Sequence, residues 1–119
     1  MAHFETDAIR TQIEQTQQHE HSTPLYLTSS FLFDDAEHMR ALFADEQEGL
    51  IYSRFTNPNT TEFVDKMCLL EGAEAGVATA TGMAAVFASI MGLLSAGDHI
   101  VASRALFGST HTLLSTYLP

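Results

Sequence analysis

One pattern limits the folds open to this chain more than any other: two short apolar stretches flank a long apolar helix. Residues 76–81 are apolar with β-branched members and predict a buried strand. Residues 82–96 are apolar on nearly every side and predict a buried helix. Residues 98–103 predict a second strand, and a further helix is expected to begin near Gly108. This order predicts a parallel sheet covered on both faces, and hence an α/β fold.

Two strands do not make a stable parallel sheet, because such sheets need several neighbours and helices on both faces. A length of 119 residues would suit one ordinary domain. The chain nevertheless stops at Pro119, inside or just after the last expected helix. We therefore expect this sequence to be the opening third of a larger α/β protein.

The first 58 residues predict an arm that needs something else to pack on. The expected elements are a helix over 5–18 with a narrow apolar face, an extended segment over 22–33, and a helix that is capped by Asp34 or Asp35 and runs to about Asp45. Its first 48 residues hold ten of the fifteen acidic residues and two of the five basic ones. We assign residues 1–58 to an N-terminal arm and interface segment.

Residues 59–119 are assigned to the start of the α/β domain. Asn59 and Glu62 form a pair like a capping box, which predicts a helix that begins there. Gly72 stands where a helix commonly ends in a left-handed residue.

The composition excludes several classes of function. The net charge of −10 repels phosphate backbones and anionic lipid, so neither nucleic acid nor a membrane surface is an expected partner. The chain has no apolar run of 18 residues and no secretory signal pattern at its start. The lone Cys68 excludes an intrachain disulfide and suits a reducing compartment. A soluble cytoplasmic protein is expected, with no metal site among its six histidines.

The turn at Gly82 and Met83 is one candidate binding site. It follows an expected strand and opens a long helix, where free backbone N–H groups and the helix dipole attract phosphate. A tight turn with no ligand would need the same glycine, so both interpretations stay open.

Two further candidates carry side-chain chemistry. Tyr52 and Arg54 lie two residues apart, so an extended strand would project both to one side, where they could hold a phosphate. An exposed loop with an ordinary arginine is the more frequent explanation of such a pair. Phe107 follows the second expected strand and could stack on a flat heterocycle, although a phenylalanine is more often part of a core.

Several motifs together resemble one enzyme family. They are Tyr52-Ser-Arg-Phe-Thr-Asn-Pro58, Leu70-Glu-Gly-Ala73, Thr81-Gly-Met-Ala-Ala85, Gly97-Asp-His-Ile-Val101 and Leu106-Phe-Gly-Ser-Thr110. In this order they resemble the Cys/Met-metabolism family of PLP-dependent enzymes, over about residues 5–118, and look most like its O-succinylhomoserine sulfhydrylase branch. The resemblance implies pyridoxal 5'-phosphate as cofactor and a large domain of the aspartate-aminotransferase-like kind, fold type I.

The resemblance also implies roles for single residues. Tyr52 and Arg54 match the pair that holds the cofactor phosphate of the neighbouring subunit. Gly82 and Met83 match the positions whose N–H groups bind the phosphate within the same subunit. Phe107 matches the ring that stacks on the pyridine. Most members have tyrosine there, so this chain keeps the ring and lacks the hydroxyl.

The lone lysine limits what the chain can do by itself. PLP enzymes hold their cofactor on a lysine, and Lys66 is the one lysine in this sequence. It lies in the helix after Asn59 without the expected surroundings, so we predict an exposed helix lysine and no catalytic residue in this chain. In the family the cofactor lysine lies far downstream.

The resemblance implies an enzyme of methionine biosynthesis and trans-sulfuration. The reaction would be γ-replacement, in which a homoserine ester loses its acyl group and sulfide or a thiol takes its place. The implied assembly is a homotetramer, a dimer of dimers in which the arm contacts the neighbouring subunit. The alternatives are a cystathionine γ-synthase or methionine γ-lyase, and, in another class, a non-catalytic assembly fragment.

Overall fold

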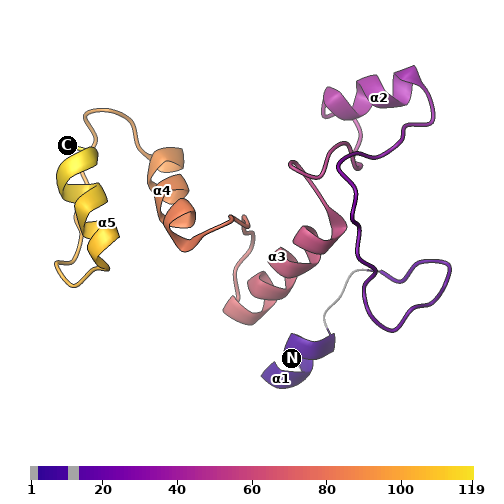
Figure 1. Cartoon of the computed structure of the whole chain (residues 1–119), viewed down its shortest axis with the longest axis horizontal. Helices are drawn as coiled ribbons and strands as arrows, with labels where there is room; N and C mark the ends of the chain where they lie inside the picture. The colour runs from indigo at the N-terminus through magenta and orange to yellow at the C-terminus, as the bar shows by residue number, and fades with distance from the viewer. Residues whose placement is uncertain (1–2, 11–13) are drawn as a thin grey trace. The chain divides into compact units, whose positions relative to one another are not determined.

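The computed structural model describes residues 3–10 and 14–119 and divides the chain into two units, Met1–Val77 and Ala78–Pro119. The first unit holds helices α1 (Phe4–Arg10), α2 (Ala36–Phe43) and α3 (Pro58–Glu71), and the second holds α4 (Gly82–Leu93), α5 (Gly108–Thr112) and the π-helical turn η1 (Leu113–Tyr117) (Figure 1). No helix in the described residues is long and apolar enough to cross a bilayer.

The first helix is shorter than the sequence predicts. Helix α1 ends at Arg10, residues 11–13 lie outside the described residues, and residues 14–18 are not helical. The Glu20 carboxylate accepts from the backbone N–H of Thr16 at 2.8 Å and from its hydroxyl at 2.7 Å. Because these bonds offer the backbone an alternative to helix, the helix predicted over 5–18 is wrong for 14–18. They also lower the pKa of Glu20.

The segment predicted to be extended is not helical, as expected. Residues 22–33 contain no helix, and Ser30 forms an antiparallel bridge with Tyr52. The N–H of Phe31 donates to the carbonyl of Ile51 at 3.1 Å, and the N–H of Ser53 donates to Ser29 at 2.9 Å. Within the arm, residues 29–31 are therefore bonded to residues 51–53, which precede α3.

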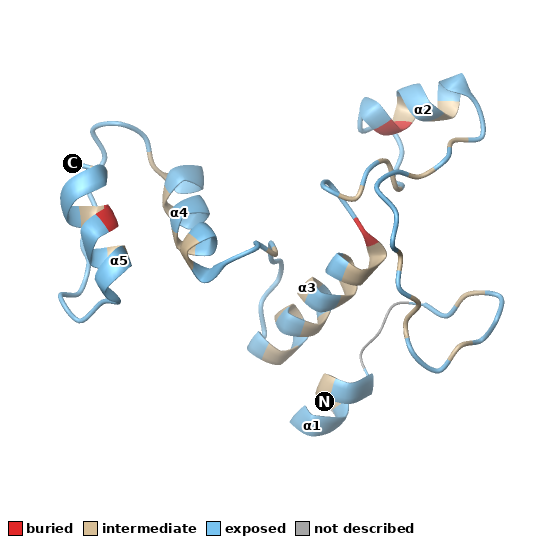
Figure 2. Ribbon diagram, in the orientation of Figure 1, coloured by how far each residue is buried: buried red, intermediate tan, exposed pale blue. Residues whose placement is uncertain are grey.

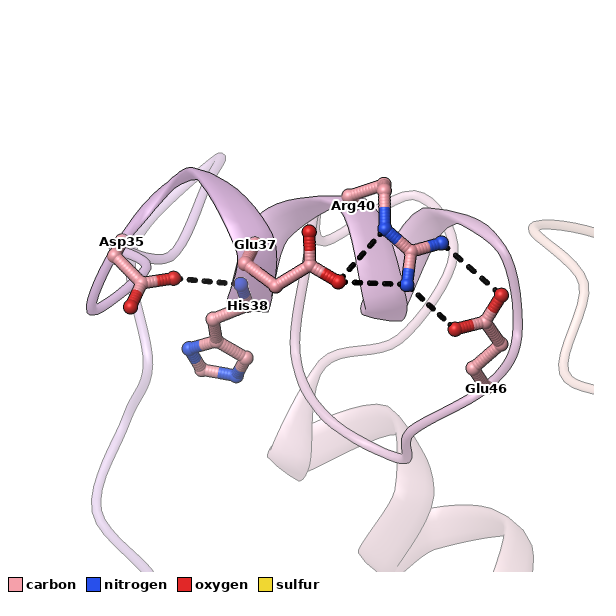
Figure 3. Close-up of polar contacts among 5 residues, drawn as sticks. All are labelled: Asp35, Glu37, His38, Arg40 and Glu46. Atoms are coloured by element: carbon pink, nitrogen blue, oxygen red, sulfur yellow. Dashed lines mark hydrogen bonds and ion pairs between the residues drawn. The ribbon is translucent and has the colours of Figure 1, made fainter.

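Helix α2 starts at the second of the two predicted caps. The Asp35 carboxylate accepts from the N–H of His38 at 2.7 Å (Figure 3). The helix ends at Phe43, two residues before the predicted end, and Asp45 takes a left-handed conformation with φ of 57°. Leu42 on this helix is 6% exposed, the one apolar side chain buried in the described part of this unit.

Helix α3 is capped by a different residue from the one predicted. The side chain of Asn57 accepts from the N–H of Asn59 at 2.9 Å, and Pro58 occupies the first turn. A proline there wastes no backbone donor and has a helical φ, which is why the helix starts earlier than predicted. Glu62 pairs with Lys66 at 3.5 Å instead of completing a capping box. The helix ends as predicted, with Gly72 left-handed at a φ of 66°.

The two predicted strands are not formed in the described residues. Residues 76–80 and 98–103 are non-helical, but neither stretch pairs with another in the described residues, where the bridge from Ser30 to Tyr52 is the one β contact. Parallel strands depend on neighbours at both edges and on helices over both faces. The described residues supply neither, so the stretches stay without a ladder.

Helix α4 begins at Gly82, as predicted, with the Thr81 hydroxyl accepting from the N–H of Ala84 at 3.1 Å. It ends at Leu93, three residues early, because the Asp98 side chain accepts from the N–H of Ser95 at 2.7 Å and closes a turn. Little of either unit is buried (Figure 2). Phe87 on α4 remains 48% exposed.

Candidate functional site

Tyr52 and Arg54 are brought together by a turn. The carbonyl of Tyr52 accepts from the N–H of Phe55 at 2.9 Å and from that of Thr56 at 3.1 Å. The guanidinium carbon of Arg54 lies 5.8 Å from the centre of the Tyr52 ring and 4.8 Å from that of Phe55. The expectation of an extended strand is therefore wrong for residues 53–55, although the pairing of the two side chains that it predicted is present.

The guanidinium of Arg54 is available to an anion. The residue is exposed, and no carboxylate lies within ion-pair distance of it in residues 3–10 and 14–119. The contrast is Arg40, whose guanidinium donates to Glu37 at 2.9 Å and to both oxygens of Glu46 at 3.0 and 2.7 Å (Figure 3). An arginine whose N–H groups have no partner can form bidentate hydrogen bonds to a phosphate. Within the described residues Arg54 has such N–H groups, whereas those of Arg40 are bonded to carboxylates.

A set of polar side chains holds this turn and the start of α3 against residues 24–26, and the sequence did not predict it. The Asn57 amide donates to the carbonyl of Tyr26 at 3.1 Å and to the hydroxyl of Ser53 at 3.0 Å. The Asn59 amide donates to the carbonyl of Pro24 at 2.7 Å and accepts from the N–H of Tyr26 at 2.8 Å. The one local signal was an Asn-Pro-Asn run before a helix.

In the second unit, Gly82 and Met83 present backbone donors at the start of α4. The hydrogen bonds of the described residues engage the N–H of Ala84 and that of Ala85, both with Thr81, but neither of the two before them. Nothing lies within 4 Å of a Cβ built on Gly82. Two open N–H groups at the positive end of a twelve-residue helix are suited to bind an anion.

Phe107 is not a core residue of this unit. Its side chain is 73% exposed, and it directly precedes α5. The Thr110 hydroxyl lies 3.7 Å from the sulfur of Met83, so the first turn of α5 is beside the start of α4. An exposed ring near two open N–H groups is a suitable surface for a flat phosphorylated heterocycle.

The remaining candidate residues, Lys66, Cys68 and the metal-ligating side chains, do not form a further site in the described residues. Lys66 is half-buried and paired with Glu62, so the prediction that it is exposed is wrong. Cys68 is half-buried as well. No group of three His, Cys, Asp or Glu side chains in the described residues could hold a metal ion.

The chemistry of each unit suits a phosphorylated ligand. In the first unit a phenol and a guanidinium can donate hydrogen bonds to a phosphate, and Arg54 adds positive charge on a chain of net charge −10. In the second unit two helix N–H groups can donate to a phosphate, and Phe107 offers an exposed ring. Taken separately, the two sets are of the kinds that suit the phosphate and the ring of a group such as pyridoxal phosphate.

Comparison with known proteins gives a consistent picture. A family model described as Cys/Met metabolism PLP-dependent enzyme matches residues 5–119. An O-succinylhomoserine sulfhydrylase of Pseudomonas aeruginosa is 46% identical over 116 residues, which are 98% of this chain and 29% of the relative. An L-methionine gamma-lyase of Porphyromonas gingivalis is 44% identical over 94 residues, which are 79% of this chain and 24% of the relative.

A solved structure is similar as well. A protein designated O-acetylhomoserine (thiol)-lyase from Campylobacter jejuni, whose structure contains a pyridoxyl-lysine phosphate, matches with a TM-score of 0.90 and 32% identity. The match covers 97% of this chain and 28% of that one. The chain thus spans less than a third of the length of each of these relatives.

Proposed function

Because the chain belongs to the Cys/Met metabolism family of PLP-dependent enzymes, we propose that it is the N-terminal part of an O-succinylhomoserine or O-acetylhomoserine sulfhydrylase. The observation that carries the proposal is the pairing of Tyr52 with an uncommitted Arg54, within a chain 46% identical to an O-succinylhomoserine sulfhydrylase. The reaction is a γ-replacement: the Cγ–O bond of the homoserine ester breaks, the acid leaves, and sulfide forms a C–S bond to give homocysteine.

Pyridoxal phosphate, the cofactor of this family, supplies the electron sink for this chemistry. The residues of this chain would bind and orient it. Gly82 and Met83 would donate their N–H groups to the phosphate in their own subunit, and Phe107 would stack on the ring. Tyr52 and Arg54 would donate to the phosphate in the neighbouring subunit. Phe107 has no hydroxyl, so it holds the ring and moves no proton.

The proposed assembly follows from the assignment of phosphate donors to two different subunits. A homo-oligomer, a dimer of dimers in this proposal, completes each phosphate site with donors from two subunits. Lys66 is committed to Glu62 on α3, so this chain by itself is proposed to lack a catalytic centre. A cytoplasmic location is part of the same proposal.

A methionine γ-lyase is the second candidate, because such a relative is 44% identical over 79% of the chain. A cystathionine γ-synthase uses the same family chemistry and is the third. A non-catalytic chain that assembles with a full-length partner remains the alternative from another class.

The test uses the complete enzyme, by which we mean this chain joined to the remaining C-terminal part of the Pseudomonas aeruginosa relative. Arg54→Ala should weaken retention of pyridoxal phosphate about tenfold or more, because a charge-assisted phosphate contact is lost. Arg10→Ala, an exposed arginine on α1, is the matched control and should retain the cofactor. Unchanged cofactor affinity in Arg54→Ala would remove the basis of the proposal.

Substrate assays then separate the candidates. Sulfide with O-succinylhomoserine or O-acetylhomoserine should give homocysteine, and the faster ester identifies the acyl donor. Release of methanethiol from L-methionine at a higher rate than either replacement reaction would favour the γ-lyase instead.

A further inference from the structure

We propose that Asn57 is a positioning residue for Tyr52 and Arg54, acting on them through Ser53. We call these two side chains, which are proposed to bind the cofactor phosphate, the phosphate grip. The proposal rests on the function proposed above, in which those two side chains hold a cofactor phosphate. It adds a residue that has no part in the family resemblance beyond its place in a motif, and whose side-chain amide is bonded at both ends to other residues of the chain.

Asn57 is the one polar residue in the described part of the chain that is buried, at 8% exposure. Its amide NH2 donates to two acceptors, the carbonyl of Tyr26 and the hydroxyl of Ser53. Its amide oxygen accepts from the N–H of Asn59. A buried amide with both ends bonded is costly to replace, because each lost partner leaves a polar group unpaired.

Ser53 is the connection to the grip. Its hydroxyl donates to the carbonyl of Thr28 while it accepts from Asn57, and its N–H donates to the carbonyl of Ser29 at 2.9 Å. Ser53 lies between Tyr52 and Arg54 in sequence, so fixing its backbone and side chain fixes the turn from which both neighbours project.

This arrangement gives Asn57 two separable jobs. The oxygen caps α3, and the NH2 group anchors the turn. Aspartate caps helices as well as asparagine does, and it benefits from the helix dipole. Asn57→Asp therefore keeps the cap and removes the anchor, since its second oxygen would face the carbonyl of Tyr26 with no hydrogen to donate.

The experiment measures two ligands on the apo form of the complete enzyme. Pyridoxal phosphate and pyridoxal, which lacks the phosphate, are titrated by absorbance. Asn57→Asp should weaken binding of pyridoxal phosphate about fivefold or more, because both anchoring bonds of the NH2 group are lost, and leave pyridoxal unchanged. Asp35→Ala removes the cap of α2 and is the control for a helix-cap defect elsewhere. It should change neither affinity.

Ser53→Ala is the second variant, because it breaks the same connection without placing a charge in a buried site. It should show the same loss for pyridoxal phosphate alone, and it decides the question if Asn57→Asp does not fold. Equal loss for both ligands, or no loss for either in Ser53→Ala, would overturn the proposal.

The two proposals fail in different ways. If Arg54→Ala also leaves pyridoxal phosphate binding unchanged, the phosphate grip itself is wrong. If Arg54→Ala weakens binding but Asn57→Asp and Ser53→Ala do not, the grip stands and the positioning role is rejected. In an Arg54→Ala background, Asn57→Asp should have a smaller effect than it has alone, as expected of residues that act as one unit.

Discussion

The guanidinium of Arg54 lies over the ring of Phe55, with its central carbon 4.8 Å from the ring centre. That distance is within the range of a cation–π contact, and the contact leaves the N–H edge of the guanidinium free. The ring is 65% exposed, so it contributes to the orientation of the arginine more than to a core.

Phe55→Leu should therefore weaken retention of pyridoxal phosphate about twofold to fivefold, because a cation–π contact at an exposed site is worth about 0.5–1 kcal/mol. The readout is cofactor affinity of the complete enzyme in an absorbance titration. Phe63→Leu, on the 58% exposed phenylalanine of α3, is the matched control. An equal loss in both variants would attribute the effect to packing in general.

Mixed oligomers test which subunit each donor serves. Arg54→Ala and Gly82→Asp should each impair cofactor binding, the second because a carboxylate repels phosphate at a position with open space. Co-expressed, the two variants should restore about a quarter of the sites, since half of random dimers are mixed and each repairs one of its two sites. No restoration would mean that Tyr52 and Arg54 serve their own subunit.

The Arg40–Glu46 pair predicts a pH effect on α2. Arg40 donates to both carboxylate oxygens of Glu46 and holds the pKa of that group below its ordinary value of 4.5. The pair's contribution is fully present above that ordinary value and is lost as the pH falls through the lowered pKa. Carbon NMR titration of the Glu46 carboxyl measures the shift. In Arg40→Gln the pKa should return towards the ordinary value, and an unchanged pKa would contradict the assignment.

The left-handed end of α3 predicts a cost at Gly72. With a φ of 66°, Gly72→Ala should lower the free energy of unfolding by about 1 kcal/mol, because a Cβ disfavours that region. Denaturant unfolding of the complete enzyme gives the value. Gly92→Ala, at a helical position in α4 with nothing within 4 Å, is the control and should be neutral or stabilising. A larger loss at Gly92 than at Gly72 would reverse the expectation.

Local signals in the sequence predicted the ends of helices. The starts of α4 at Gly82 and α5 at Gly108 and the end of α3 at Gly72 follow from single residues whose backbone freedom or position is decisive. At the start of α3, Asn57 and Asn59 could each have been the N-cap. Asn57 is the cap because Pro58, between them, is favourable at the first helical position.

Long-range contacts were not predictable in the same way. The bonds from Asn57 and Asn59 to residues 24–26 join positions 31 to 35 residues apart, and no local pattern encodes such partners. The pairing of Tyr52 with Arg54 was predicted from their spacing in an extended strand. In the structure a turn brings them together, because the carbonyl of Tyr52 accepts hydrogen bonds from the N–H groups of Phe55 and Thr56. The two predicted strands have no partner in the described residues, since a strand needs a partner and an apolar run does not supply one. The similarity to the solved structure supports the fold class itself.

The scarcity of buried apolar side chains has a thermodynamic consequence. Leu42 and Leu113 are the buried apolar residues of the described ranges, and the helix α4 keeps much of its apolar surface in contact with water. The heat capacity of unfolding and the denaturant dependence of stability both scale with the apolar surface that unfolding exposes. The isolated chain should therefore melt gradually, with a small heat-capacity step, and a sharp calorimetric transition should arise when other surfaces cover α4.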